Sequence, residues 1–153
     1  MLITARKQGA PRLRDGVLGH ARSHDLATWE LQPPLTEPAG FGEFEVAQAR
    51  VIDGRPLLVF TCHPDQQAPE QLARFGRCCA WSAPGASLTG PWDIAAARPF
   101  AGEPDLYAAQ LVQRRDGSHA LLGFLHREAE GIDSLAIVDP IPVAVVDGTL
   151  RAG

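Results

Sequence analysis

A glutamate interrupts an apolar run in the first half of the sequence. The run reads GEFEVAQARVIDG over residues 42–54, and Glu45 stands between Phe44 and Val46. Because side chains alternate along a strand, Phe44 and Val46 facing a packed interior would turn Glu45 to the opposite side. A partly desolvated carboxylic acid in that position could donate a proton to a leaving oxygen and later accept one. The alternative is a solvated glutamate at a strand edge.

Three more polar residues are candidates for contacting a polyhydroxylated ligand. Asp105 and Tyr107 open the run DLYAAQLV, and His20 lies in GHARS, where it could line a pocket. Their alternative roles are a turn aspartate, a packing tyrosine and a structural histidine. Asp25, in SHDLATW, is expected to support the turn before a tryptophan.

The cysteines and the motif content indicate no cofactor. Cys62, Cys78 and Cys79 are odd in number and two are adjacent, so they do not form a disulfide framework. Cys62 and His63 lack a second Cys/His pair at zinc spacing. Glycine-rich phosphate loops, GxSxG and HExxH are absent. We therefore expect neither a metal nor an organic cofactor, and structural roles for the cysteines.

The two halves of the sequence repeat each other. Asp53-Gly54 and Asp116-Gly117 are hairpin signals separated by 116 − 53 = 63 residues. Trp29 and Trp92 are separated by 92 − 29 = 63 residues as well. An apolar strand follows each Asp-Gly pair, and a recurring strand unit of this kind is typical of a propeller blade.

Counting back from the two Asp-Gly pairs aligns the candidate site residues of the two units. This alignment matches Glu45 with Ala108 and Phe44 with Tyr107. The first strand of a blade is the innermost one, so these positions are expected to line a central hollow.

Short strands account for most of the chain, and the best helix candidate, 69–75, is barely two turns long. The sequence predicts an all-β fold, a partial β-propeller of four-stranded antiparallel blades with about two and a half blades present; a β-sandwich is the alternative. The expected divisions are 1–35, 42–95 and 104–153. The expected strands are 2–5, 17–22, 28–31, 44–52, 56–62, 77–82, 106–113, 119–125, 134–138, 142–146 and 149–152.

The charge and hydropathy patterns exclude two classes of partner. The net charge is −4, the sequence pI is about 5.7, and there is no basic stripe, which argues against nucleic acid. No apolar stretch approaches the roughly 20 residues of a membrane span. The first residues have no apolar segment of signal-peptide length, so the expected location is the cytoplasm, with a secreted parent enzyme as the alternative.

Three stretches together resemble glycoside hydrolase family 32, the β-fructosidases. HARSHDLATWELQPPL is similar to the family's S-x-D-L-x-x-W edge, and FEVAQARVIDGRPLLVF to its W-E-C-P-D strand and following hairpin. DLYAAQLVQRRDGSHALLGF resembles its D-F-Y-A stretch. The resemblance implies a five-bladed propeller and a β-fructofuranoside substrate. Val46-Ala47-Gln48 in place of C-P-D, and Phe124 in place of a tryptophan, leave room for the related families 43, 62 and 68.

The resemblance also implies roles for single residues. Glu45 falls on the family's general acid/base, and Asp105 and Tyr107 fall on its substrate-side D-x-Y-A motif. The family's nucleophile and its transition-state aspartate come from W-x-N-D-P-x-G and R-D-P, and neither motif occurs here. The sequence thus resembles a family member truncated just after R-D-P. Such a chain is expected to be inactive alone, because a retaining mechanism needs two carboxylates about 5–5.5 Å apart.

A second function fits the same sequence. A partial propeller could be a non-catalytic module that binds carbohydrate or another protein. The open edges of its blades could pair with strands of another chain.

Overall fold

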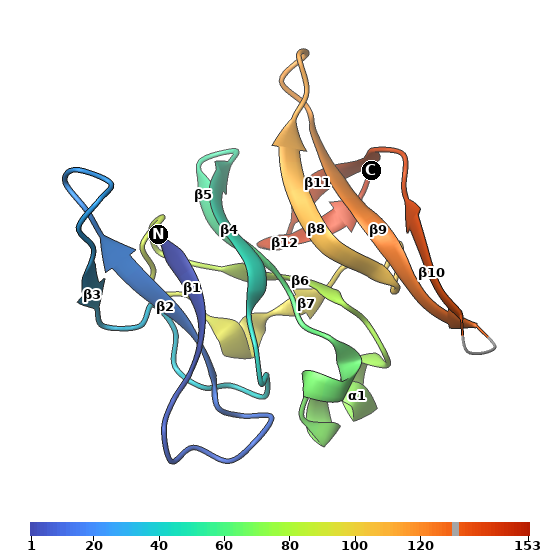
Figure 1. The fold of residues 1–153 in the computed structure, drawn as a ribbon. Helices are drawn as coiled ribbons and strands as arrows, with labels where there is room; N and C mark the ends of the chain where they lie inside the picture. The colour runs from blue at the N-terminus through green and yellow to red at the C-terminus, as the bar shows by residue number, and fades with distance from the viewer. Residues whose placement is uncertain (130–131) are drawn as a thin grey trace.

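The computed structural model describes residues 1–129 and 132–153, which form a partial propeller of three antiparallel sheets (Figure 1). The first sheet contains β1 (Leu2–Arg6), β2 (Gly16–Arg22) and β3 (Glu30–Gln32). The second contains β4 (Glu45–Ile52), β5 (Arg55–Thr61), β6 (Ala80–Pro84) and β7 (Arg98–Pro99). The third contains β8 (Leu106–Gln113), β9 (His119–Ala129), β10 (Ile132–Ile137), β11 (Ile141–Val146) and β12 (Thr149–Ala152). The helical segments are α1 (Pro69–Phe75) and the 3-10 turns Pro64–Gln66 and Ile94–Ala96.

The third sheet has the strand order of the second once β10 and β11 are taken together. Both pair with the same long strand, β10 with 124–129 and β11 with 119–121, while β8 pairs with it on the other side. The amide of Val138, between them, donates to the carbonyl of Gly123 at 3.1 Å. β10 and β11 are therefore two parts of one third strand, and β12 is the fourth.

The predicted strands occur, with shifted ends. The helix at 69–75 and the strands at 106–113 and 149–152 have the predicted bounds. The strand predicted at 77–82 begins later, at Ala80, because Cys79 donates its amide to Pro104 and accepts from Cys62, outside the β6 pairing. The strand predicted at 28–31 spans only Glu30–Gln32, because Asp25 holds the preceding residues in a turn.

The central strand β5 separates two hydrophobic cores. Leu58 and Phe60 face the first sheet, and Leu57 and Val59 face the third, so every residue of 57–60 is buried. This is the alternation of a strand covered on both faces. The first core includes the aromatic residues Phe41, Phe44, Phe60, Trp81 and Trp92.

The inner strands β4 and β8 contain matching bulges, which correct the alignment made from the Asp-Gly pairs. Val46 and Ala108 adopt the left-handed φ values 44° and 50°, and the strand register shifts at each. Glu45 therefore corresponds to Tyr107, with 107 − 45 = 62, and not to Ala108. The prediction was wrong by one residue, because the Asp53-Gly54 hairpin has two loop residues and the other has five, 114–118.

The bulge also overturns the expected packing of Val46. Phe44 is fully buried in the first core, as predicted, but the Val46 side chain is 43% exposed. One extra residue in the strand breaks the simple alternation, so the residue after Glu45 turns toward solvent.

Candidate functional site

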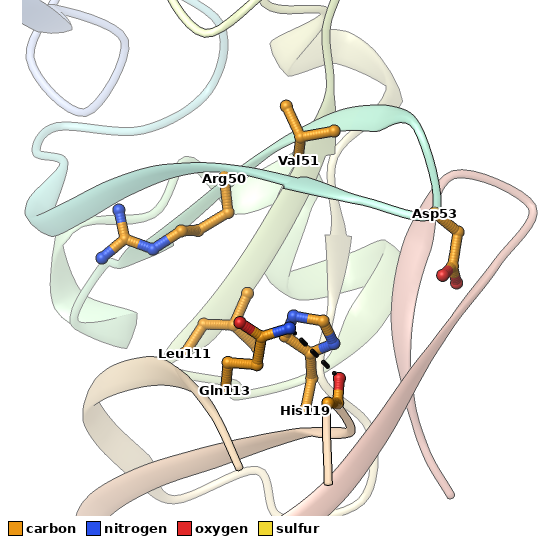
Figure 2. A pocket seen from close by; sticks show the side chains of 7 residues that line it. Arg50, Val51, Asp53, Leu111, Gln113 and His119 are labelled. Atoms are coloured by element: carbon orange, nitrogen blue, oxygen red, sulfur yellow. Dashed lines mark hydrogen bonds between the residues drawn. The ribbon is translucent and has the colours of Figure 1, made fainter. Parts of the chain in front are cut away.

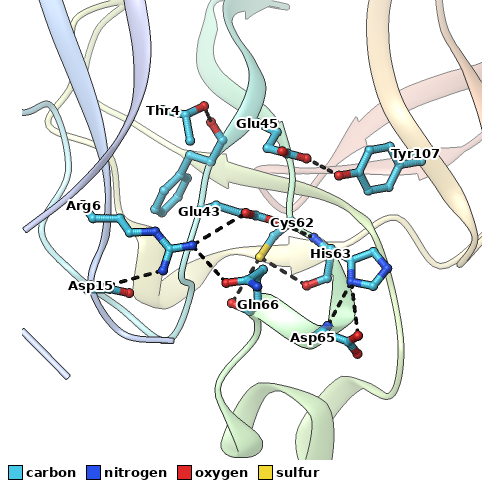
Figure 3. A network of polar contacts seen from close by, with 11 residues as sticks. Thr4, Arg6, Asp15, Glu43, Glu45, Cys62, His63, Asp65, Gln66 and Tyr107 are labelled. Carbon is cyan, nitrogen blue, oxygen red and sulfur yellow. Dashed lines mark hydrogen bonds and ion pairs between the residues drawn. The ribbon is translucent and has the colours of Figure 1, made fainter. Parts of the chain in front are cut away.

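Glu45 and Tyr107 meet where the inner strands of the second and third sheets lie side by side. The Tyr107 hydroxyl donates a hydrogen bond to the Glu45 carboxylate (Figure 3). Three residues further along each strand, Gln48 Nε2 donates to Gln110 Oε1 at 2.6 Å. The Leu111 amide donates to Gln48 Oε1 at 2.7 Å. These side-chain bonds join β4 to β8 without a backbone ladder, which is how neighbouring blades can meet.

The residues before and after Glu45 in the chain both fix its position. Phe44 anchors the residue before it in the first core, and the Phe44 carbonyl accepts a 2.7 Å hydrogen bond from the Thr4 hydroxyl. The bulge at Val46 then turns the chain after it. Glu45 is half-buried and is the first residue of a strand, the kind of support that fixes a catalytic side chain.

A second carboxylate, Glu43, lies two residues before Glu45. Its side chain is only 15% exposed, with Arg6 at 3.9 Å and the His63 amide at 3.4 Å (Figure 3). The Arg6 guanidinium also donates hydrogen bonds to the Asp15 carboxylate at 3.4 Å and to the Gln66 side-chain oxygen at 3.0 Å. Burial, followed by the charge of Glu45, raises the pKa of the Glu43 carboxyl above its ordinary value of 4.5, and the Arg6 charge offsets this only in part.

The Tyr107 ring lies near two histidine rings, those of His63 and His126. The ring centroids of His63 and His126 are 5.4 Å apart, and those of Tyr107 and His126 are also 5.4 Å apart. Burial and the bond to Glu45 raise the pKa of the Tyr107 phenol, so it remains a proton donor at neutral pH. Sequence reasoning missed both histidines as site residues, because they come from the end of β5 and from β9 and meet only in the folded chain.

Asp105 lies at the start of β8, next to this group. Its carbonyl accepts a 2.9 Å hydrogen bond from the His126 amide. Its charge adds to burial in raising the pKa of two thiols, Cys78 and Cys79, the second to about 12. Asp105 and Tyr107, both candidates from the sequence, thus lie at the same end of β8. Asp105 is the one whose charge acts on Cys78 and Cys79.

His20 does not join the Glu45 group. It lies on β2, opposite Leu2 of β1, and lines a separate hollow of about 450 Å³ between the first sheet and the loop 86–90. The structure therefore brings Glu45 and Tyr107 into contact, places Asp105 two residues before Tyr107, and leaves His20 in a separate hollow.

The opposite end of β4 carries a further hollow, of about 350 Å³, between the hairpins that follow β4 and β8 (Figure 2). Arg50 and Asp53 line it from β4 and its turn, and Gln113 and His119 from the other hairpin. No residue of the predicted site belongs to it.

The cysteines and histidines form no metal centre in the parts of the chain that the structure describes. Within 1–129 and 132–153, no three His, Cys, Asp or Glu residues are placed to hold a metal ion. Cys62, Cys78 and Cys79 are free and buried. Burial raises the pKa of the Cys62 thiol, which keeps it protonated. None of the described helices is long and apolar enough to cross a bilayer.

The fold and this site are those of a propeller with an acidic residue on an inner strand. Solved structures with the same fold include the GH32 β-fructofuranosidase BmSUC1 of Bombyx mori, with a TM-score of 0.73 and 17% identity over 99% of this chain and 33% of that one. The sucrose-6-phosphate hydrolase of Lactobacillus gasseri matches with a TM-score of 0.71 and 15% identity, over 97% and 32%. The inulosucrase of Halalkalicoccus jeotgali, solved bound to kestose, matches with a TM-score of 0.66 and 21% identity, over 94% and 41%.

The likeness establishes the propeller fold, and the chain spans about a third of the length of the first of these structures. No protein-family model and no curated protein matches the sequence.

Proposed function

We propose that this chain is part of a glycosidase-type protein that acts on β-fructofuranosides or related glycosides, with Glu45 as the general acid/base. The observation that carries the proposal is the Glu45–Tyr107 hydrogen bond, which joins two inner strands of a propeller at a half-buried carboxylate. The fold is shared with structures named as fructosidases and sucrose hydrolases, which supports the substrate class.

In the proposed reaction Glu45 moves one proton in each of two steps. A carboxylate nucleophile attacks the anomeric carbon while Glu45 gives its proton to the departing oxygen. Water then attacks the glycosyl–enzyme bond, and Glu45 takes the proton that water loses. The Tyr107 phenol stabilises the Glu45 carboxylate between the two steps, because a hydrogen bond to an ionised acceptor is stronger than one to a neutral acceptor.

Glu43 is not the proposed nucleophile. Glu43 and Glu45 are only two residues apart in the chain, whereas the two carboxylates of a glycosidase flank the scissile bond. Its low exposure and its contacts with Arg6 and His63 give it an electrostatic role beside Glu45. None of the residues named for this site is proposed as the nucleophile, so the isolated chain is expected to be inactive.

Chemical rescue tests this assignment. Azide or formate can attack an anomeric carbon in place of a missing carboxylate, while the aryl oxygen leaves with the proton of Glu45. We expect no hydrolysis of sucrose or of an aryl β-fructofuranoside by the chain alone, and azide-dependent release of the phenol that is lost in Glu45→Gln. The Glu37→Gln variant, at an exposed carboxylate outside the site, is the matched control and should keep rescue.

Two results would contradict the proposal. Rescue that is equal in the chain and in Glu45→Gln would remove Glu45 from the proton transfer. Turnover without azide that vanishes in Glu45→Gln would show that the second carboxylate is already present, within one chain or between two.

A non-catalytic module is the second candidate, favoured by the edges of the sheets. Among the described strands, β1 pairs with β2 alone and β4 with β5 alone, so backbone groups on one side of each can accept a further strand. We propose that blade boundaries fall at 1–35, 42–95 and 104–153, the second extended to Pro99 by β7. Sugar binding with no azide rescue would favour this candidate.

A further inference from the structure

The hollow that contains His20 has the features of a binding site separate from Glu45. We propose that it binds a neutral or acidic sugar ring stacked on Trp29, and we call it the Trp29 hollow. It measures about 450 Å³, within the range of small-ligand sites. Its principal lining residues are His20, Arg22, Trp29, Leu35, Leu88 and Thr89.

Trp29 is much more exposed than its counterpart in the repeat. Trp92 is its counterpart in the sequence repeat, and the Trp92 side chain is 5% exposed within the first core. A Cβ atom at Gly85 would collide with the Trp92 ring, so that ring is closely covered. Trp29 is 39% exposed, and within 1–129 and 132–153 no other aromatic ring packs against it.

A flat, accessible indole suits the C–H face of a sugar ring. Aromatic rings combine a large apolar surface with a polar edge, and a sugar offers the matching arrangement of C–H and O–H groups. Leu35 and Leu88 supply further apolar wall, and Leu88 is 49% exposed. An exposed leucine beside an exposed tryptophan in one hollow is the apolar half of such a site.

The polar half contains a histidine whose hydrogen bonding is incomplete. The Nδ1 atom of His20 is buried and has no hydrogen-bond partner among the described residues. A buried polar atom without a partner costs free energy, and a turn of the partly buried His20 ring would bring this nitrogen to a ligand hydroxyl and recover that cost. Arg22 and Thr89 line the same hollow and add a guanidinium and a hydroxyl.

The loop before Trp29 is organised without a ligand. Asp25 Oδ1 accepts hydrogen bonds from the amides of Ala27 at 2.9 Å and Thr28 at 2.7 Å, as the sequence predicted for this turn. The Ser23 hydroxyl also donates to Asp25 at 3.0 Å. Holding the loop in place beforehand lowers the entropy cost of binding.

The charges of the lining define which sugars fit. Arg22 lines the hollow with its guanidinium, and no described lining residue is a carboxylate. Neutral sugars and sugar acids are therefore accepted, and amino sugars are disfavoured by the positive charge. Without a carboxylate to protonate a leaving oxygen, this site would hold a ring and not cleave it.

The test uses the full chain labelled with 5-fluorotryptophan, whose three resonances are assigned from single Trp→Phe variants. Neutral and uronic-acid trisaccharides are titrated to millimolar concentrations, with a glucosamine trisaccharide as the negative arm. We expect the Trp29 resonance alone to shift saturably. The affinity is measured from the anomeric or amide NMR signals of the sugar. Trp29→Ala should lower it by about tenfold or more, and His20→Ala by a smaller factor.

Two controls separate binding from folding and from the Glu45 site. Trp92→Phe changes a buried indole and should leave affinity within about twofold. Glu45→Gln should leave the saturable shift of the Trp29 resonance unchanged, so a failure of the Glu45 proposal does not affect this result. The proposal is overturned if no trisaccharide shifts the Trp29 resonance, or if the affinity survives in a folded Trp29→Ala variant.

Discussion

The inner strands β4 and β8 have the same backbone and opposite chemistry. Each has a left-handed residue one position after the site residue and a glutamine two positions further on, Gln48 in one and Gln110 in the other. At the matched position β4 carries Glu45, an acceptor, and β8 carries Tyr107, a donor. The repeat therefore conserves the shape that aims a side chain, while the side chains differ so that neighbouring blades complement each other.

Substitutions of the residues that anchor the two strands should have the largest effect on the free energy of unfolding. Phe44 and Leu106 occupy matched positions and are both fully buried, one in each core. Phe44→Ala should lower the free energy of unfolding by about 3–5 kcal/mol and Leu106→Ala by about 2–5 kcal/mol. Denaturant titration measures both. Val51→Ala, at a half-exposed position of β4, is the control and should change stability little.

The hydrogen bond between the strands should contribute less. Tyr107→Phe removes the donor and should lower the free energy of unfolding by about 1.5–2 kcal/mol at neutral pH, the lower part of the range for a charged acceptor, because both groups are only half-buried. In a Glu45→Gln background the same change should cost less. Equal costs in the two backgrounds, measured as a double-mutant cycle, would show that the bond contributes nothing.

The bulge should give a smaller effect of opposite sign. Val46 has φ 44°, which disfavours an L-residue by about 1–2 kcal/mol, and glycine avoids this while losing about 0.5–1 kcal/mol through unfolded-chain entropy. Val46→Gly should therefore stabilise the protein slightly, by about 0.5–1 kcal/mol. Ala144→Gly, in the exposed part of β11, should destabilise it by a similar amount. A loss of stability in Val46→Gly would mean that the valine side chain stabilises the bulge.

The smallest effect concerns pH, and it arises from Glu43, whose counterpart before β8 at the same 62-residue offset is Asp105. The pKa of Glu43 is raised in the folded chain, so the native state binds the proton more tightly than the unfolded state does. Stability should therefore fall as pH rises from the ordinary value of 4.5 through the raised pKa. Glu43→Gln should flatten this slope, and Glu37→Gln, at an exposed carboxylate, should not.

Glu45→Gln offers an independent check of the same pKa. Removing the Glu45 charge should lower the pKa of Glu43 toward its ordinary value, without restoring it fully, because burial is the larger cause. Carboxyl carbon resonances followed by NMR titration report this directly. An upward shift would contradict the described arrangement.

Much of the fold could be predicted because the signals are local. Asp53-Gly54 forms a two-residue hairpin with φ values of 50° and 75°, as the pair indicates, and the apolar run at 57–60 is buried on both faces. The structure joins Glu45 and Tyr107 by a hydrogen bond, and their role in one functional site stays a prediction.

The remaining features depend on contacts that no short segment contains. The bulges fall at Val46 and Ala108, neither of which is the glycine that would announce a left-handed residue. The second Asp-Gly pair lies in a five-residue loop closed by the Arg114 amide and the Ser118 carbonyl, which displaced the alignment by one. His63 and His126 are brought together by tertiary packing alone.

Because β5 is buried on both faces, the three sheets depend on one another for stability. Its side chains are shared alternately between the two cores, so removing either neighbouring sheet would leave half of them facing water. A nick in the loops between sheets should not release an autonomous fragment, and the β5 amides should be among the last to exchange with deuterium, because only opening of the whole molecule uncovers them.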